Sequence, residues 1–295
     1  MLATVIGQDL EADGKGRFRI ARRVAKDRVI STVDPQARHG HKTRARGFDG
    51  YKGHAAVDPD SEIVTDTVVT PGNAGDGSVA EDLIDDLIDI DNDKDGVDID
   101  DDRVEGAPRR TVYGDNAYGT GEFQQVLDDA GIESRCKTQH PTAPGGMFPK
   151  DRFRIDLAAD TVSCPNGITV SIRRHRDGTG AASFAEHCLS CPLRAGCTTS
   201  KTRRQINVGV HEAALVRARH RQQDPVWRDD YRATRPKVER KLAHLMRRSH
   251  GGRNARVRGT LKVDADFNLL AVAANFARLA VLGLRSTTSG WTVTS

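Results

Sequence analysis

The stretch TVYGDNAYGTGE, residues 111–122, has the pattern of a short strand that ends in a carboxylate and then turns into a helix. Asp115 stands at the carboxyl tip of the strand, and GEFQQVLDDAGI (121–132) has helical spacing, with Gly131 as its stop. In open α/β sheets, functional sites lie at the carboxyl ends of strands. This position favours Asp115 as a metal ligand, with an ordinary turn residue or helix N-cap as the alternative.

The chain before this stretch has the alternating pattern of strands. Strands are predicted at 17–24 and at 28–34, where Asp34 and Pro35 end the second one, and a basic loop is predicted at 35–48. Two further strands, 50–58 and 62–70, are joined by Pro59-Asp60-Ser61 and form a hairpin. A helix follows, with one apolar stripe made of Leu83, Ile84, Leu87 and Ile88.

The chain after this stretch changes from an irregular segment to helices. Residues 135–200 carry four of the five cysteines and indicate an insertion, 210–249 is helical, and 264–284 is apolar enough for a buried helix that starts at an acidic cap. Strands, hairpin, helix, strand, helix and a helical C-terminus indicate an α/β three-layer domain.

The charges are segregated along a chain whose net charge is only +4. Residues 81–102 hold twelve acids and one lysine, whereas residues 201–260 hold seventeen Lys/Arg against five acids. Such a basic segment predicts a polyanion partner, with nucleic acid as the first candidate and a solvated arginine-rich helix as the alternative. No run of about 18 apolar residues occurs, so no membrane span is expected.

The basic segment also contains a candidate for the functional site, the helix YRATRPKVERKLAHLMRR at 231–248. Steps of four place Tyr231, Arg235 and Glu239 on nearly one face, with Arg247 eight residues beyond Glu239. The alternative is a plain Arg–Glu salt bridge. Pro236 is expected to kink this helix or to begin a new one.

These three segments together resemble one protein family. The hairpin FDGYKGHAAVDPDSEIVTDTVVTPGNAGD, the strand TVYGDNAYGTGEF and the helix with NLLAVAANFARLAVL resemble, in the same order, the DDE-type transposases of bacterial insertion sequences, from about Arg28 to Leu284. The resemblance implies an RNase-H-like mixed sheet flanked by helices, interrupted here by the cysteine-bearing insertion and completed by a helical C-terminus. It also implies three acids that hold two Mg²⁺ or Mn²⁺ ions for strand cleavage and strand transfer.

The resemblance assigns roles to individual residues. Asp115 is similar to the second acid of the family and Glu239 to the third, while Tyr231, Arg235 and Arg247 resemble its Tyr–Arg–Glu–Lys/Arg signature, which steers DNA. The first acid normally precedes the hairpin in an Asp-Gly-Thr or Asp-Ser-Thr context, and no such tripeptide precedes Phe48. We therefore expect the chain to lack the family's N-terminal part, with Asp34 as the only strand-terminal acid available for that place.

The resulting division is an upstream remnant (1–27), the first part of the core (28–134), the cysteine-rich insertion (135–205), the C-terminal helices (206–286) and a tail (287–295). The expected partners are transposon ends and target DNA, with a homodimer on the DNA, no membrane, and a cytoplasmic, nucleoid-associated location. The alternatives are an inactive remnant that still binds DNA, a nuclease on the same fold, and a zinc-dependent interaction module.

The remaining motifs concern metals and phosphates. Cys164, Cys188, Cys191 and Cys197 have spacing that suits a closed structural Zn²⁺ site, in which His187 is an alternative ligand; free buried thiols are the alternative to a metal site. Cys136 has no predicted role. DNDKDGVDIDDD (91–102) matches the start of a calcium loop, but an acidic surface loop is favoured because Gly106 and Pro108 interrupt the exit helix. Lys42 and Arg44 belong to a basic cluster that is expected to contact DNA phosphates, or else to be solvated.

Overall fold

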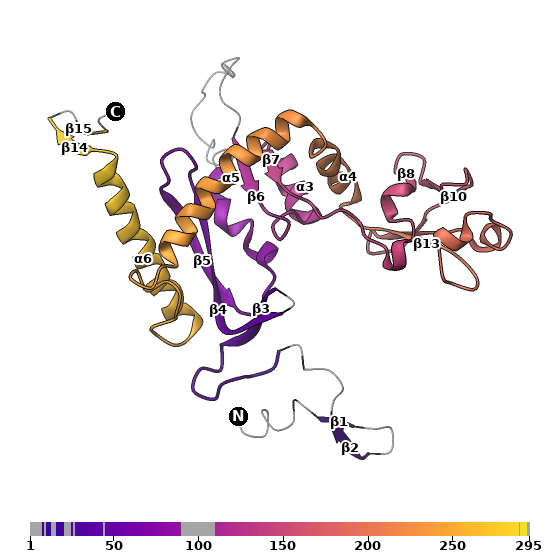
Figure 1. Ribbon diagram of the computed structural model, residues 1–295, viewed down its shortest axis with the longest axis horizontal. Helices are drawn as coiled ribbons and strands as arrows, with labels where there is room; N and C mark the ends of the chain where they lie inside the picture. Colours follow the sequence, from indigo (N-terminus) through magenta and orange to yellow (C-terminus); the bar gives the residue numbers. More distant parts are fainter. Residues whose placement is uncertain are drawn as a thin grey trace. The chain divides into compact units, whose positions relative to one another are not determined.

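The computed structural model describes residues 8, 10–12, 16–20, 25, 27–43, 45–89, 110–288 and 290–293. It has a mixed α/β architecture whose sheets are small and separate (Figure 1). The strands are β1 Leu10–Ala12, β2 Phe18–Ile20, β3 Arg38–Thr43, β4 Arg46–Val57, β5 Val64–Pro71, β6 Thr111–Gly114, β7 Glu133–Cys136, β8 Arg154–Asp156, β9 Thr161–Ser163, β10 Thr169–Ser171, β11 Arg173–Arg174, β12 Gly180–Ser183, β13 Gln205–Val208, β14 Leu284–Thr287 and β15 Gly290–Val293. The α-helices are α2 Asp85–Asp89, α3 Gly121–Asp129, α4 Glu212–Arg221, α5 Pro225–Leu245 and α6 Thr260–Val281.

The chain divides into two compact units. The first unit consists of Met1–Asp101 and Arg232–Ser295, and the second consists of Asp102–Tyr231. The division falls within α5, so that one helix belongs partly to each unit.

The first unit is built on the antiparallel sheet β3-β4-β5. The predicted hairpin is confirmed, because β4 pairs with β5 from Tyr51 opposite Pro71 to Val57 opposite Val64. Helix α6 packs on this sheet through a core of buried residues that includes Val64, Val69, Val263 and Phe267. Gly53 makes this packing possible, since a Cβ atom there would lie 2.9 Å from the Phe267 ring.

The second unit begins with the parallel pair β6 and β7, which α3 connects. Thr120 caps α3 by accepting a hydrogen bond from Phe123 N, and Gly131 ends it with φ of 63°. The helical spacing predicts Phe123, Val126 and Leu127 on the inner face; Phe123 and Leu127 are buried, whereas Val126 is only half-buried and Gln124 is fully buried instead.

The cysteine-bearing part of the second unit contains two three-stranded antiparallel sheets, ordered β10-β9-β8 and β11-β12-β13. Their shared core contains Phe153, Val162, Ile172, Ala182, Phe184, Ile206 and Val208. The prediction of an irregular segment at 135–200 is therefore wrong. These strands are two to four residues long, too short for alternation to be visible in the sequence.

Several other predicted boundaries differ from the structure. No strand forms at 28–34, and the predicted loop at 35–48 contains β3 and the start of β4. Strand β3 lies at the sheet edge, where charged side chains are common because they discourage further strand pairing. Of the predicted strand 17–24, residues 17–20 are described, and Phe18–Ile20 form β2.

The helices also differ in detail from their predictions. A 3₁₀ turn at Asp76–Val79 follows β5, and the apolar stripe after it is divided between the 3₁₀ turn Asp82–Ile84 and the short α2, with Leu83 and Ile84 buried. Helix α5 continues through Pro236 without a break, and α6 begins four residues before the predicted acidic start.

Candidate functional site

Asp115 lies where the sequence predicts it, directly after β6 at the carboxyl end of the parallel pair. Its Oδ1 accepts a hydrogen bond from Ala117 N at 2.9 Å, and its carbonyl oxygen accepts from Tyr118 N and Gly119 N. The carboxylate thus organises the turn between the strand and α3. The turn is tight, because a Cβ atom on Gly119 would collide with the Lys137 carbonyl group after β7.

A second acid near β6, Asp230, was not predicted from the sequence. Its carboxylate accepts hydrogen bonds from Tyr113 Oη at 3.0 Å and from Arg135 Nε at 2.8 Å, so that the first turns of α5 are bonded to both β6 and β7. Trp227 Nε1 donates to the Ser134 carbonyl oxygen at 3.1 Å and adds a second link. In the sequence, only the position of Asp230 next to Tyr231 could have indicated that Asp230 links α5 to β6 and β7.

Tyr231 is buried within the second unit. Its ring stacks on Trp227 with 5.3 Å between centroids and 5° between planes, and Lys137 Nζ lies 4.4 Å from the Tyr231 ring centroid. The ring therefore contributes to packing and to a cation–π contact.

Glu239 lies on the part of α5 that belongs to the first unit. Its side chain is 62% exposed, and its Oε1 lies 3.3 Å from Nε of the largely buried Arg235. This is the i,i+4 ion pair that the sequence offered as the alternative interpretation, and it leaves the carboxylate open to solvent. The prediction that Arg247 shares the helix is wrong, because α5 ends at Leu245 and Arg247 lies in the following turn.

Asp34 lies in a bend rather than at the end of a strand. Its Oδ1 accepts a hydrogen bond from Tyr51 Oη at 2.7 Å, and its Oδ2 is 3.5 Å from Gly259 N, just before α6. Burial, reinforced by the bond to Asp34, raises the pKa of Tyr51 to about 12. Asp34 therefore ties three segments of the first unit together.

The basic hairpin of β3 and β4 exposes cations. Lys42 and His41 are exposed on β3, while His39 is paired through Nδ1 with Asp49 Oδ1 at 2.7 Å. Arg44 lies outside the described residues, as does the whole acidic segment 91–102. The hairpin has the charge that phosphate contacts need.

A polar cluster on β4 was also not predicted. Lys52 Nζ donates to Asp76 Oδ1 and to the Ala74 carbonyl oxygen, both at 2.7 Å, and the buried His54 contacts Thr70 Oγ1 through Nε2 at 2.9 Å. Burial lowers the pKa of His54, while Asp76 acts to raise it and Lys52 to lower it. These contacts fix the loop after β5 to the sheet.

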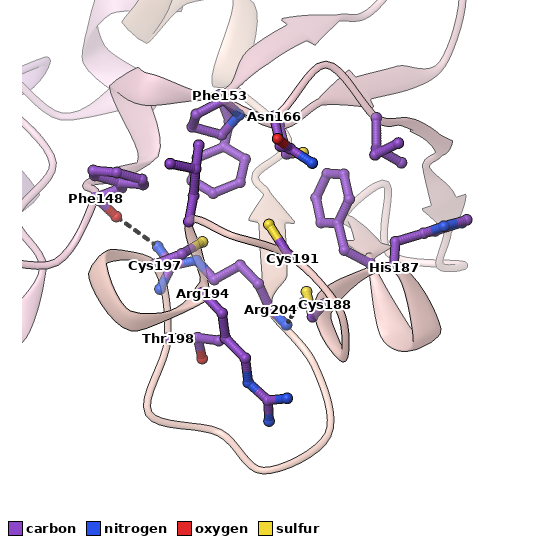
Figure 2. A pocket seen from close by; sticks show the side chains of 15 residues that line it. Phe148, Phe153, Asn166, His187, Cys188, Cys191, Arg194, Cys197, Thr198 and Arg204 are labelled. Atoms are coloured by element: carbon purple, nitrogen blue, oxygen red, sulfur yellow. Dashed lines mark hydrogen bonds between the residues drawn. The ribbon is translucent and has the colours of Figure 1, made fainter.

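The four cysteines that the sequence groups together do line one pocket in the second unit (Figure 2). Cys188 and Cys197 are buried, and Cys164 and Cys191 are half-buried. Burial raises the pKa of the Cys197 thiol, and the other three thiols of the pocket act in the same direction. Among the described residues, no three His, Cys, Asp or Glu side chains are already grouped closely enough to hold a metal ion.

The predicted site residues are divided between the two units. Asp115, Tyr231 and the four pocket cysteines belong to the second unit, whereas Asp34, Lys42, Arg235, Glu239 and Arg247 belong to the first. Within the described part of the chain, no helix combines the length and apolarity that crossing a membrane requires.

Comparison with known proteins gives one family. Residues 163–280, less than half of the chain, match the family model of the transposase DDE domain. This segment includes the four pocket cysteines, Tyr231, Arg235 and Glu239. No curated protein and no solved structure matches the chain.

Proposed function

The match at residues 163–280 supports a DDE-type transposase, and from that premise we propose that this protein cleaves and joins DNA strands in DNA transposition. The observation that carries the proposal is this match over the segment that contains Glu239. The position of Asp115 at the carboxyl end of β6 adds to it, since that is where α/β folds place functional groups.

We propose Asp115 and Glu239 as ligands of divalent metal ions, with Asp34 as the third acid. Their carboxylate oxygens are hard donors of the kind that Mg²⁺ and Mn²⁺ prefer. The bound ions would supply Lewis-acid activation of the attacking hydroxyl and stabilisation of the leaving oxygen.

The proposed core is RNase-H-like. The order of elements along the chain supports this proposal: three antiparallel strands (β3, β4 and β5), then a parallel strand–helix–strand unit (β6, α3 and β7), and later the helices α5 and α6. The cysteine-bearing insertion, at 135–205, then separates the second acid from the third.

The proposed partner is DNA, both the ends of the mobile element and its target. Lys42, Arg44, Arg235 and Arg247 would contact phosphates, which gives affinity without sequence readout. Tyr231 would act beside them by holding the start of α5 in place, which agrees with its burial against Trp227. A homodimer on the DNA and a location at the nucleoid belong to the same proposal.

The test is a cleavage and joining assay on duplex DNA that contains the element's end and its flank. We expect nicked and joined products in Mg²⁺ or Mn²⁺, and their loss in Asp115→Asn and in Glu239→Gln. Glu122→Gln is the matched control, because Glu122 is an exposed acid in the first turn of α3.

The rival functions give different products. Salt-dependent DNA binding without any nicking, in either metal, would identify an inactive remnant. Nicking without joined products would identify a nuclease on the same fold. Absence of both binding and nicking would favour an interaction module.

A further inference from the structure

The pocket that contains Cys164, Cys188, Cys191 and Cys197 is not needed by the proposed strand chemistry. Three parts of the chain supply the thiols: the β9–β10 turn, the 3₁₀ turn Ala185–Cys188 with the residues after it, and the end of the 3₁₀ turn Arg194–Gly196. The β9–β10 turn is well separated in sequence from the two 3₁₀ turns, which follow one another closely, and all three parts line one partly open pocket. We propose that the four thiolates bind one structural Zn²⁺ ion.

The turns that carry the cysteines are held by backbone hydrogen bonds. Cys164 N donates to Ile168 O, and Gly167 N donates to Cys164 O at 2.9 Å, with Gly167 at φ of 82°. The first cysteine therefore stands on a tight turn that closes a β-hairpin. Such a turn presents its side chain to one side, as zinc-binding turns do.

The second group of thiols is bonded to the neighbouring strand. Arg204 N, just before β13, donates to Cys188 Sγ at 3.4 Å, and Arg204 Nη2 donates to the Phe148 carbonyl oxygen at 3.0 Å. The Arg204 guanidinium also lies 5.4 Å from the Phe153 ring centroid. Figure 2 shows Arg204 among Cys188, Cys191 and Cys197. These contacts hold the segment that carries Cys188 against the residues just before β13.

The fold around the pocket has little else to hold it together. Its two sheets have strands of two to four residues, and its core is one cluster of nine buried residues that includes Cys188 and Cys197. Small domains of this kind are commonly stabilised by a metal or by disulfides. The cysteines form no disulfide in the structure, so the thiols are available for a metal.

Four thiolates with no open position make a closed, structural site. The thiols must draw together to reach zinc–sulfur distances of about 2.3 Å. Cys164 and Cys191 are the half-buried members, and they are the two that we expect to move.

The experiment measures metal in the full chain without DNA, so its result is independent of strand cleavage. We expect one zinc per chain after purification in zinc-containing medium. Replacement of zinc by Co²⁺ should give the intense absorption of tetrahedral thiolate coordination. Cys191→Ser should lose this spectrum, whereas Cys136→Ala, which changes a buried cysteine outside the pocket, should retain it.

Wild-type protein provides the second measurement, because Cys191→Ser could lose the spectrum by failing to fold. Native mass spectrometry of the wild-type chain should show a mass increase of one zinc, and a mercurial reagent should release that zinc. The proposal is overturned if the wild-type chain carries no zinc, if Co²⁺ gives only the weak spectrum of octahedral oxygen ligands, or if Cys136→Ala removes the metal as well.

Discussion

At the scale of the residue, Asp34 combines a structural position with a proposed metal role. Its two carboxylate oxygens face Tyr51 Oη and Gly259 N. Hydrogen bonds of this kind also orient the carboxylates that bind metals, so the contacts are compatible with both roles. Two variants distinguish the structural role of Asp34 from the proposed metal role.

Asp34→Asn is expected to abolish strand cleavage in Mg²⁺, as Asp115→Asn does, because the amide replaces an anionic ligand. Tyr51→Phe removes the hydrogen bond but keeps the carboxylate, and it should retain cleavage. The measurement is the nicking rate of each purified variant, with thermal unfolding recorded alongside. If both variants cleave DNA and both lose stability, Asp34 has only the structural role.

His54 supplies a prediction on pH. Burial lowers the pKa of His54 below its ordinary value of 6.5, so the folded chain resists protonation of this ring while the unfolded chain does not. The contribution of His54 to the free energy of unfolding is therefore fully present above pH 6.5. It is lost as the pH falls from there through the folded-state pKa.

The direct measurement is an NMR titration of the ten histidines. One resonance should titrate clearly below pH 6.5 and be missing from His54→Gln. That variant should also lose less stability than the wild-type chain between pH 7 and pH 5. Equal losses in both proteins would show that His54 does not contribute.

At the scale of the element, side chains of α6 form hydrogen bonds with backbone groups of β5 at the edge of the sheet. Asn275 accepts from Val64 N at 2.9 Å and donates to Val64 O at 2.8 Å, and Asp264 Oδ1 accepts from Val69 N at 2.8 Å. A strand edge needs such partners, because unpaired backbone groups that are buried destabilise the fold. Side chains of one helix thus replace a neighbouring strand.

Asn275→Ala is expected to lower the free energy of unfolding by about 1–3 kcal/mol, since it leaves the N–H and C=O groups of Val64 without partners. Asn268→Ala is the matched control on the same helix. Its amide makes one 3.4 Å contact, to Thr67 Oγ1, and its removal should cost about 1 kcal/mol or less. Denaturant unfolding of the two variants measures the difference, and a larger loss in Asn268→Ala would contradict this account of the edge.

The elements also show how much of the secondary structure could be predicted from the sequence. Strands β4 and β5 were predictable because eight or more residues display their alternation, with a clear turn between them. Helix α3 was predictable from its cap, its apolar spacing and Gly131. By contrast, β3 is rich in cations and looks like a loop in sequence, and its edge position becomes evident only from its pairing with β4.

The candidate site was predictable to a similar degree. Asp115 could be placed because a strand, an acid and a glycine turn adjoin in the sequence. The bonds of Asp230 to Tyr113 and Arg135 could not, because they join residues 95 or more positions apart. Nor could the sequence foresee that Lys137 would lie over the Tyr231 ring, since the packing of a helix against particular strands is set by tertiary structure.

At the scale of the whole molecule, fewer cations of the basic segment 201–260 are available to a DNA partner than its composition suggests. Arg217 and Arg221 are paired with Asp128, Arg219 with Glu212, Arg240 with Glu62, and Arg256 with Asp266. These cations form ion pairs within the folded chain. The salt dependence of DNA binding should thus reflect far fewer phosphate contacts than the seventeen Lys/Arg in this segment.

Lys42→Ala and Arg247→Ala should each lower the slope of log K against log salt by about 1, because each removes one of the phosphate contacts that we propose. Arg285→Ala, which changes an exposed cation of β14, is the control and should leave the slope unchanged. Fluorescence anisotropy with a labelled duplex over a range of salt concentrations gives the three slopes. Unchanged slopes for Lys42→Ala and Arg247→Ala would exclude these residues from the DNA interface.

The central claim, that Asp115 binds a divalent metal during strand cleavage, is tested most directly by changing the ligand and then the metal. Asp115→Cys replaces a hard oxygen by a soft thiolate, which binds Mg²⁺ poorly and accepts softer ions. We predict that Asp115→Cys fails to nick DNA in Mg²⁺ but recovers nicking in Mn²⁺ or Cd²⁺, while Asp115→Ala stays inactive in every metal. Wild-type levels of nicking by Asp115→Ala in Mg²⁺ would contradict the assignment.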